Sequence, residues 1–462
     1  TGTTGFARTG GLVGEIKNTS PVTIEAIELY NNVESPEKEI GGLLGYIFNT
    51  DTTPLSLNRI THVGQVRGGG DVGGLIGAMY YSNIVILNSL STGTIASNNT
   101  QTGLEIGGFV GKFFTAEFRG RLELTNSYFT GEISAATSPY LGTIIGRLSD
   151  HTNPTPSDAV LTFSSIYYLT GSGLNSIVSN FDNLTISGMA TELSEAKFTA
   201  ESSFDGWDIE KHPTSSATWS IQYDGQTTYP WLTFTEQPHT SQIVNTVPVL
   251  SGDDFKTIEE NLFGSFLLEN DIDLSAFGLT TQSFIDGTFT GNLSGAGFAI
   301  ENLKVNGSVE DVEYSGPGSI LGLFSILSGA NIENLIIDGF NVTGTRNIGA
   351  LAGYVSGNDT TRIQQVTVTN SSLYASAHPS SSISDDANLG SLIGGAFNTT
   401  LEISEVDAQT TLRSPKNYIG GILGVIGSSN VTISNSTYSG VIEGGIRLGG
   451  FVGLMNGSSN VT

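Results

Sequence analysis

Two aspartates, Asp271 and Asp273, have the clearest spacing for metal chemistry in this 462-residue sequence. They lie two residues apart in the stretch from Phe266 to Leu274, so on a strand their side chains would share one face. Carboxylate oxygens are the ligands that calcium prefers. The sequence has no Asp-x-Asp-x-Asp-Gly loop, so we favour local hydrogen bonding by these side chains over calcium binding. Calcium is the weak cofactor candidate, and no other cofactor is expected.

Residues able to catalyse hydrolysis are sparse. The chain has no cysteine, no Gly-x-Ser-x-Gly elbow and no His-Glu-x-x-His motif. Close groupings of charge occur at Asp253-Asp254 and Asp385-Asp386, and such pairs in loops are usually solvated. The sequence therefore predicts no catalytic residues and no enzymatic activity in this segment. The five histidines are scattered: His62, His151, His212, His239 and His378.

All three tryptophans, Trp207, Trp219 and Trp231, fall within one short stretch. Exposed indoles would form a platform for sugar rings, and these residues are the candidate glycan platform. The alternative is a small core that covers an open end of a sheet, and we favour it because exposed strand edges need covering. The loop from Ser376 to Asn388 is a second candidate for glycan contact.

The composition limits the classes of partner. The formal net charge is −26, from 44 acidic and 18 basic residues, so nucleic acid and anionic membranes are disfavoured. The content of hydrophobic residues, 38%, and their regular placement argue against a disordered chain. No apolar run is long enough to span a membrane.

A phrase of the form Gly-Gly-apolar-apolar-Gly recurs along the chain. The spacing of about 30 to 40 residues is typical of a solenoid, in which each coil buries its apolar face against the next. The last six residues, Gly457 to Thr462, repeat Gly427 to Thr432. The phrase stands at Gly10–Gly14, Gly41–Gly45, Gly73–Gly77, Gly107–Gly111, Gly420–Gly424 and Gly449–Gly453, with looser copies from Gly142, Gly349 and Gly390.

The phrase and the segments after it predict strands. Leu43 and Leu44 are adjacent, so both point inward only if both faces of the strand are covered or the chain bends locally, and the flanking glycines permit such a bend. β-Branched segments follow, as at Asn83–Ser89, Leu122–Tyr128 and Val431–Tyr438. We therefore expect an all-β fold of tandem parallel β-solenoid modules, with two or three short strands in each coil.

Changes in composition divide the chain into four parts. Residues 1–187 read as the C-terminal part of a first solenoid, 188–235 as a tryptophan-containing closing segment, 236–249 as a linker, and 250–462 as the N-terminal part of a second solenoid. A helix is expected from Thr191 to Phe198, and another after Ser251 through Leu262. Both ends of the chain fall inside repeats, so we expect a piece of a longer polypeptide.

The phrase Gly10-Gly11-Leu12-Val13-Gly14 and its copies resemble the GLUG-motif repeats of large bacterial surface proteins. The stretches Asp271–Leu274 and Gly291–Leu303 are similar to the opening segment of such arrays, and Phe204–Leu232 is similar to their closing segment. The resemblance implies an adhesin-like β-solenoid. The motif occurs in adhesins, in exported proteases and in proteins of no assigned role.

The resemblance and the lack of catalytic motifs together predict a non-catalytic segment of a giant extracellular repeat protein that forms a surface fibre or stalk. The alternatives are an adhesin module that binds glycans or surfaces, and a β-helical enzyme that acts on polysaccharides. The expected partners are further modules of the same kind, joined end to end, and cell-surface glycans. Asn-x-Ser/Thr triplets, such as the one at Asn370, are read as turn formers.

Overall fold

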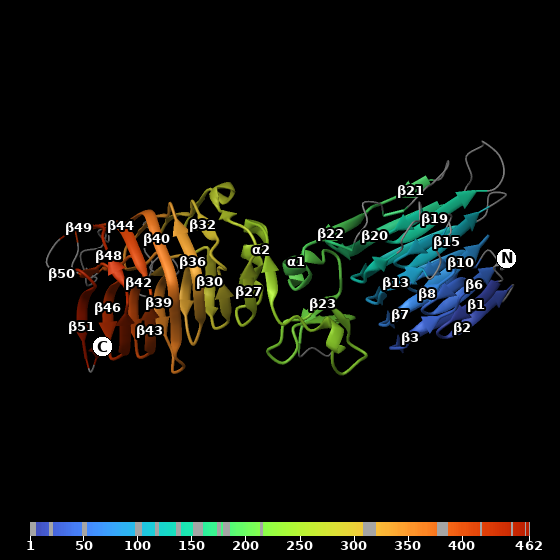
Figure 1. Cartoon of the computed structure of the whole chain (residues 1–462), viewed down its shortest axis with the longest axis horizontal. Coiled ribbons are helices and arrows are strands. Elements are labelled where there is room, and N and C mark those ends of the chain that lie inside the picture. The colour runs from blue at the N-terminus through green and yellow to red at the C-terminus, as the bar shows by residue number, and fades with distance from the viewer. Residues whose placement is uncertain are drawn as a thin grey trace. The chain divides into compact units, whose positions relative to one another are not determined.

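The chain folds into two compact units in a computed structural model (Figure 1). Unit 1 contains Thr1–Asp224 and Thr228–Ile243, and unit 2 contains Gly225–Thr227 and Val244–Thr462. Each unit is all-β and contains sheets of parallel strands, which confirms the expected solenoid class. The structure describes residues 6–17, 22–48, 53–97, 104–115, 120–134, 140–150, 160–172, 177–178, 185–212, 216–307, 320–376, 387–415, 418–444, 447–457 and 459–461.

Unit 1 has four parallel sheets, each built from one strand or strand pair of every successive coil. The first contains β1 (Phe6–Gly10), β5 (Lys38–Gly41), β9 (Gly70–Gly73), β14 (Glu105–Gly107) and β18 (Tyr140–Gly142). The second contains β2 (Val13–Lys17), β6 (Leu44–Phe48), β10 (Ile76–Tyr80), β15 (Val110–Thr115) and β19 (Ile145–Asp150). The third contains β3 (Thr23–Leu29), β7 (Leu55–His62), β11 (Asn83–Leu87), β12 (Leu90–Ser91), β16 (Arg121–Phe129), β20 (Val160–Leu169), β21 (Thr185–Ser187) and β22 (Ala190–Leu193). The fourth contains β4 (Val33–Glu34), β8 (Val66–Gly68), β13 (Ile95–Ser97) and β17 (Ile133–Ser134).

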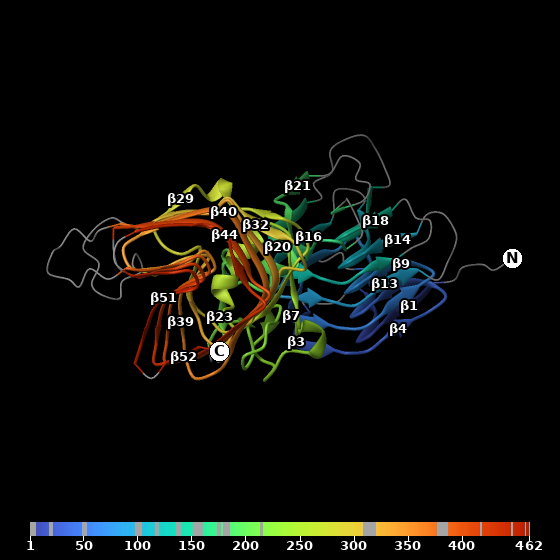
Figure 2. The same cartoon turned by 60° about the vertical axis from the view of Figure 1, so that its left-hand side comes forward.

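Unit 2 is also built of stacked coils, and its parallel strands form three sheets. Figure 2 views its coils more nearly along the stack, where strands of successive coils overlap. One sheet contains β30 (Ile285–Phe289), β35 (Phe324–Leu327), β39 (Ala352–Ser356), β42 (Ile393–Phe397), β46 (Leu423–Gly427) and β51 (Val452–Asn456). A second contains β34 (Ile320–Leu321), β38 (Asn347–Ile348), β41 (Asn388–Gly390), β45 (Tyr418–Gly420) and β50 (Arg447–Gly449). The third and widest contains β26 (Val247–Val249), β27 (Ser265–Leu268), β28 (Ile272–Asp273), β29 (Leu279–Thr280), β31 (Asn292–Ser294), β32 (Ala299–Glu301), β33 (Lys304–Asn306), β36 (Asn331–Asp338), β37 (Asn341–Gly344), β40 (Thr361–Ala375), β43 (Thr400–Ser404), β44 (Asp407–Ser414), β47 (Asn430–Ser434), β48 (Thr437–Tyr438), β49 (Val441–Gly444) and β52 (Asn460–Val461).

Each glycine phrase is the junction of two strands. In the copy from Gly41 to Gly45, β5 ends at Gly41, β6 begins at Leu44, and the two residues between them form a bend. Leu43 and Leu44 are both fully buried, so the predicted bend is confirmed. A coil of unit 1 has four strands, one more than expected, because this corner divides the phrase into two strands. In unit 2 the coil formed by β38, β39 and β40 has three strands, as expected.

In some copies of the phrase the second glycine packs against a ring from its own coil, as Gly42 and Gly108 do. A Cβ added to Gly42 would lie 2.7 Å from the ring of His62, and one added to Gly108 would lie 2.8 Å from Cγ of Phe129. Both rings lie inside the coil. The same Cβ would lie even closer to a carbonyl oxygen of the next coil, 2.2 Å from that of Gly74 for Gly42 and 2.1 Å from that of Thr143 for Gly108, so a side chain at either glycine would meet both the ring and the neighbouring backbone.

The helices are shorter than the sequence predicts. The helix α1 spans Glu195–Phe198 and is capped by Ser194, not by Thr191. Thr191 lies in β22, which pairs with β20. Strand pairing with the neighbouring coil therefore determines the conformation here, and not the local helix propensity. Ser251 caps α2 (Gly252–Lys256) as predicted, but a 3₁₀ turn, η3 (Thr257–Glu260), ends the helix before Leu262.

The segments near the middle of the chain are ordered locally. In unit 1 they form η1 (Glu201–Ser203), β23 (Ile209–Lys211), β24 (Trp219–Ile221), β25 (Trp231–Leu232) and η2 (Thr240–Gln242). The expected linker, 236–249, thus contains η2 and also β26, which pairs with β27 in unit 2. No helix within the described ranges is long and apolar enough to cross a membrane.

Candidate functional site

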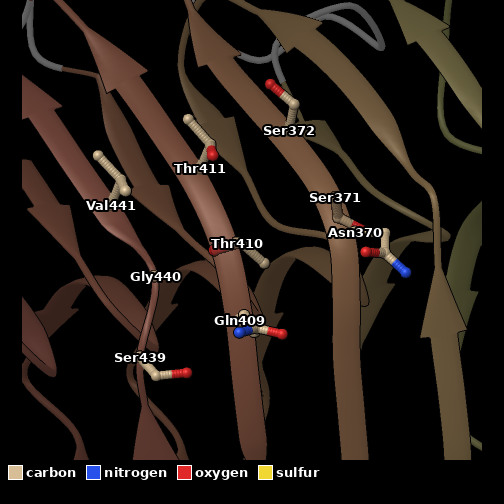
Figure 3. Close-up of a pocket in the computed structure, with 9 residues that line it drawn as sticks. All are labelled: Asn370, Ser371, Ser372, Gln409, Thr410, Thr411, Ser439, Gly440 and Val441. Atoms are coloured by element: carbon tan, nitrogen blue, oxygen red, sulfur yellow. The ribbon is translucent and has the colours of Figure 1, made fainter.

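Unit 2 has a polar pocket of about 410 Å³ on the widest sheet (Figure 3). Three successive coils contribute to it, through β40, β44 and the segment that joins β48 to β49. None of its lining residues is charged. They are Asn370, Ser371, Ser372, Gln409, Thr410, Thr411, Ser439, Gly440 and Val441.

A one-residue bulge creates the recess. Along β40 and β44, Val368 pairs with Ala408 and Ser371 pairs with Thr410, so two residues of β40 lie opposite the single residue Gln409. One of those two is Asn370, whose φ of 49° turns the chain sharply. Strand β40 therefore bends at Asn370, and the register of its pairing with β44 shifts there.

Gly440 completes the recess in the third coil. A Cβ at this position would lie 2.0 Å from the carbonyl oxygen of Thr410, so only glycine lets the backbone come this close. Its neighbour Ser439 is exposed, and no larger side chain fills the opening. Figure 3 shows two outer rows across the three strands, one of Asn370, Gln409 and Ser439 and one of Ser372, Thr411 and Val441.

Hydrogen bonds fix the floor and one wall of the pocket. The hydroxyl of Ser371 donates to the carbonyl oxygen of Thr369 at 2.7 Å and accepts from the N–H of Phe340 at 3.0 Å. The amide of Asn370 donates to Oδ1 of Asp338 at 2.7 Å. These bonds hold the lining in place before any ligand binds. The pocket offers donors and acceptors but no general base to activate a hydroxyl, so its geometry suits binding.

The two calcium candidates serve as hydrogen-bond acceptors. Oδ1 of Asp271 accepts from the N–H of Ala299 at 2.8 Å. The exposed Asp273 accepts from the N–H of Ser275 at 2.9 Å and from the amide of Asn302 at 3.0 Å, which together hold the pKa of Asp273 below its usual range. Within the described ranges no three His, Asp or Glu side chains are grouped so as to bind a metal.

The three tryptophans are buried in unit 1. Their exposed fractions are 8% for Trp207, 0% for Trp219 and 2% for Trp231, so no indole face is open to a sugar ring. Trp207 and Trp219 lie with ring centroids 4.5 Å apart, and Tyr128 packs 5.8 Å from Trp219. Of the candidate glycan loop, residues 377–386 lie outside the described ranges, as do His151, His378 and Asp385-Asp386.

Charged side chains from successive coils of unit 1 lie close together, around Asp71 and Glu105. The sequence analysis did not identify this cluster. Burial raises the pKa of Asp71, and the hydrogen bond with the carboxyl of Glu105 raises it further. Burial acts against ionisation of Glu105, yet the bond from Asp71 and the cations Lys112 and Arg147 hold its pKa below the usual value. Nη1 of Arg147 lies 3.0 Å from Oε1 of Glu105. The signal in the sequence is an acid immediately before Ile/Val-Gly-Gly in three successive copies of the phrase, at Glu39, Asp71 and Glu105.

His62 is fully buried, and an interaction with the backbone of Asn31 favours its protonated form without offsetting the effect of burial. Burial lowers its pKa from 6.5 to about 4. Between pH 6.5 and pH 4 the ring of His62 is protonated in the unfolded chain but not in the folded chain. The free energy of unfolding therefore decreases as the pH falls from 6.5 towards 4. The loss attributable to this residue is about 2 kcal/mol at pH 5.

Replacing His62 by phenylalanine is expected to remove that loss. His62, Ser91 and Phe129 occupy the same register position in three successive coils. Phe129 packs against Gly108 of its coil, as His62 packs against Gly42. Urea unfolding at pH 7 and pH 5 measures the effect: the variant should lose about 2 kcal/mol less than the native chain between the two pH values. An equal loss in both proteins would show that other groups set the acid sensitivity.

Comparison with known proteins relates unit 2 to peptidases. A family model described as "M26 IgA1-specific Metallo-endopeptidase N-terminal region" matches residues 251–370. The matched region begins at the cap of α2 and ends at Asn370 in the pocket. The chain is similar to immunoglobulin A1 proteases.

The similarity to these relatives is partial. The immunoglobulin A1 protease of Streptococcus pneumoniae is 26% identical over 220 residues, which cover 45% of this chain and 10% of the relative. That of Streptococcus sanguinis is 28% identical over 191 residues, or 39% of this chain and 9% of the relative. Halomucin of Haloquadratum walsbyi (strain DSM 16790 / HBSQ001) is 32% identical over 115 residues, 24% of this chain and 1% of that protein. The chain thus spans about a tenth of the length of the two proteases. No solved structure matches.

These findings correct the sequence-based interpretation. The matching family is the N-terminal region of a metallopeptidase, so the resemblance to GLUG-repeat surface proteins named the wrong family. The expectation of a non-catalytic fibre, with an adhesin module or a polysaccharide-active enzyme as alternatives, was likewise wrong, because the family model and the two streptococcal relatives are those of proteases. The physical reason is that stacked repeats specify an architecture, and one architecture supports many functions.

Proposed function

We propose that this chain is a β-solenoid region of an extracellular metallopeptidase of the immunoglobulin A1 protease kind, and that it binds the polypeptide substrate. The observation that carries the proposal is the family match over residues 251–370 of unit 2. The similarity to the two streptococcal proteases extends over 45% and 39% of the chain and supports it.

The described residues do not fit a catalytic metal. A peptidase zinc site needs three protein ligands close together, and the described part of the chain has no such group. We therefore assign this region substrate binding and not metal binding. Stacked coils suit that role, because they present an extended, rigid surface over which contacts with a long polypeptide can be distributed.

The proposal is tested with the full-length protein that contains this chain and with the chain alone. The full-length protein is expected to cleave immunoglobulin A1, and removal of metal by EDTA should abolish cleavage. The chain alone is expected to bind immobilised immunoglobulin A1 and not immunoglobulin G. Intact immunoglobulin A1 after incubation would contradict the peptidase assignment. Cleavage without binding by the chain would contradict the substrate-binding role alone.

A further inference from the structure

The pocket over β40, β44 and β49 is neutral in a strongly acidic protein. None of its nine lining residues is charged, although the chain has a formal net charge of −26. A cationic ligand would find no carboxylate in the lining to pair with. An anionic ligand would meet no cation there and would be repelled by the surrounding charge. The lining therefore favours an uncharged ligand.

The polar groups of the lining match a ligand with many hydroxyl groups. Asn370 and Gln409 provide exposed amides, and each amide carries both a donor and an acceptor. Ser372, Thr411 and Ser439 add hydroxyls, which both donate and accept. A sugar presents the same mixture of donors and acceptors at close spacing. The pocket volume of about 410 Å³ falls within the usual range for small-molecule sites.

An extended peptide is a poorer match. Peptides that bind to sheets pair their backbone with a free strand edge. Strand β40 pairs with β36 and β37 on one side and with β43 and β44 on the other, and β44 pairs onward with β48 and β49. Neither β40 nor β44 therefore offers a free edge at the pocket. In the described part of the chain the unpaired edge is that of β48 and β49, which pair only with β44. The lining also lacks the apolar pockets that hold peptide side chains, since Val441 is its only apolar side chain.

An exposed aromatic ring lies beside the polar rows. Tyr374 is 41% exposed and follows Ser372 by two residues on β40, so both side chains point to the same face. Its register partner on β44 is Arg413, which is paired with Glu443 at 2.8 Å. The ring supplies a flat, rigid apolar surface next to a cluster of hydrogen-bonding groups.

We propose that this pocket binds a neutral oligosaccharide, with the amides of Asn370 and Gln409 contacting its hydroxyls and Tyr374 packing against a ring. The inference stands on the pocket alone and does not depend on the proposed substrate-binding role of the chain.

The test applies the whole chain to an array of immobilised neutral oligosaccharides and their sialylated and sulfated counterparts. Binding to neutral members is expected. The affinity for the best neutral oligosaccharide is then measured by calorimetry for the native chain and two variants, Gln409→Ala and Ser439→Tyr. The first loses an amide that would make two hydrogen bonds, and the second fills the recess. Each is expected to weaken binding about tenfold or more.

The matched control is Gln364→Ala, which removes an exposed amide from the same strand, β40, outside the pocket. Its affinity should equal that of the native chain, and thermal unfolding should be alike in all four proteins. The proposal fails if no neutral oligosaccharide binds, if acidic members bind better than neutral ones, or if both pocket variants bind normally. Displacement of the sugar by a serine- and threonine-rich peptide of higher affinity would reassign the pocket to polypeptide.

Discussion

Replacing Gly421 by alanine is expected to destabilise unit 2 by about 3 kcal/mol or more. The added Cβ would lie 2.0 Å from the carbonyl oxygen of Gly450 in the next coil and 2.6 Å from Cδ1 of Tyr438. The two coils cannot separate to make room, because the N–H of Gly421 donates to the carbonyl oxygen of Gly449 at 3.1 Å. The methyl group therefore either breaks this pairing or displaces the buried face of the tyrosine ring.

Gly450→Ala is the matched control. Both substitutions are made in the 462-residue chain, in which a Cβ at Gly450, the second glycine of the next copy of the phrase, meets no atom within 4 Å. The control should change stability by no more than about 0.5 kcal/mol. Unit 2 has no tryptophan, so amide hydrogen exchange of its strands is the measurement. Equal destabilisation by both substitutions would show that the contact with the neighbouring coil is not the cause.

The sequence predicts the solenoid because its strongest signals are local. The Gly-Gly-apolar-apolar-Gly phrase requires a bend, and the bend at Gly42 and Leu43 is where the phrase predicts it. The ring that covers the second glycine comes from elsewhere in the coil, as His62 does for Gly42, and nothing in the phrase indicates which residue that is. The fourth strand in the coils of unit 1 was missed for the same reason.

The pocket could not be predicted from the sequence. Its residues belong to three coils, and they meet only because a one-residue bulge at Asn370 sets the register of β40 against β44. In the sequence, Asn370 reads only as part of an Asn-x-Ser triplet. The relation to metallopeptidases was also hidden, because the described residues have no metal-binding group to indicate that chemistry.

Replacing Trp219 by alanine is expected to destabilise unit 1 by about 3–5 kcal/mol. The side chain is fully buried, so its loss leaves a cavity between the rings of Trp207 and Tyr128. Tyr128 cannot move to fill it, because its hydroxyl donates to the carbonyl oxygen of Pro230 at 2.7 Å and accepts from the amide of Gln242 at 3.1 Å. Urea unfolding followed by the fluorescence of Trp207 and Trp231 measures the change in the free energy of unfolding.

Two phenylalanine variants separate lost volume from lost hydrogen bonding. Within the described structure the indole N–H of Trp219 has no partner, so Trp219→Phe removes a buried donor that was already unsatisfied. The indole N–H of Trp207 donates to the carbonyl oxygen of Ser165 at 3.2 Å, so Trp207→Phe also breaks a bond. We expect Trp207→Phe to cost about 1 kcal/mol more than Trp219→Phe, and Trp219→Phe to cost much less than Trp219→Ala. A larger loss of stability for Trp219→Phe than for Trp207→Phe would mean that the indole N–H of Trp219 has a hydrogen-bond partner in solution. Trp219 would then stabilise unit 1 through a hydrogen bond as well as through packing.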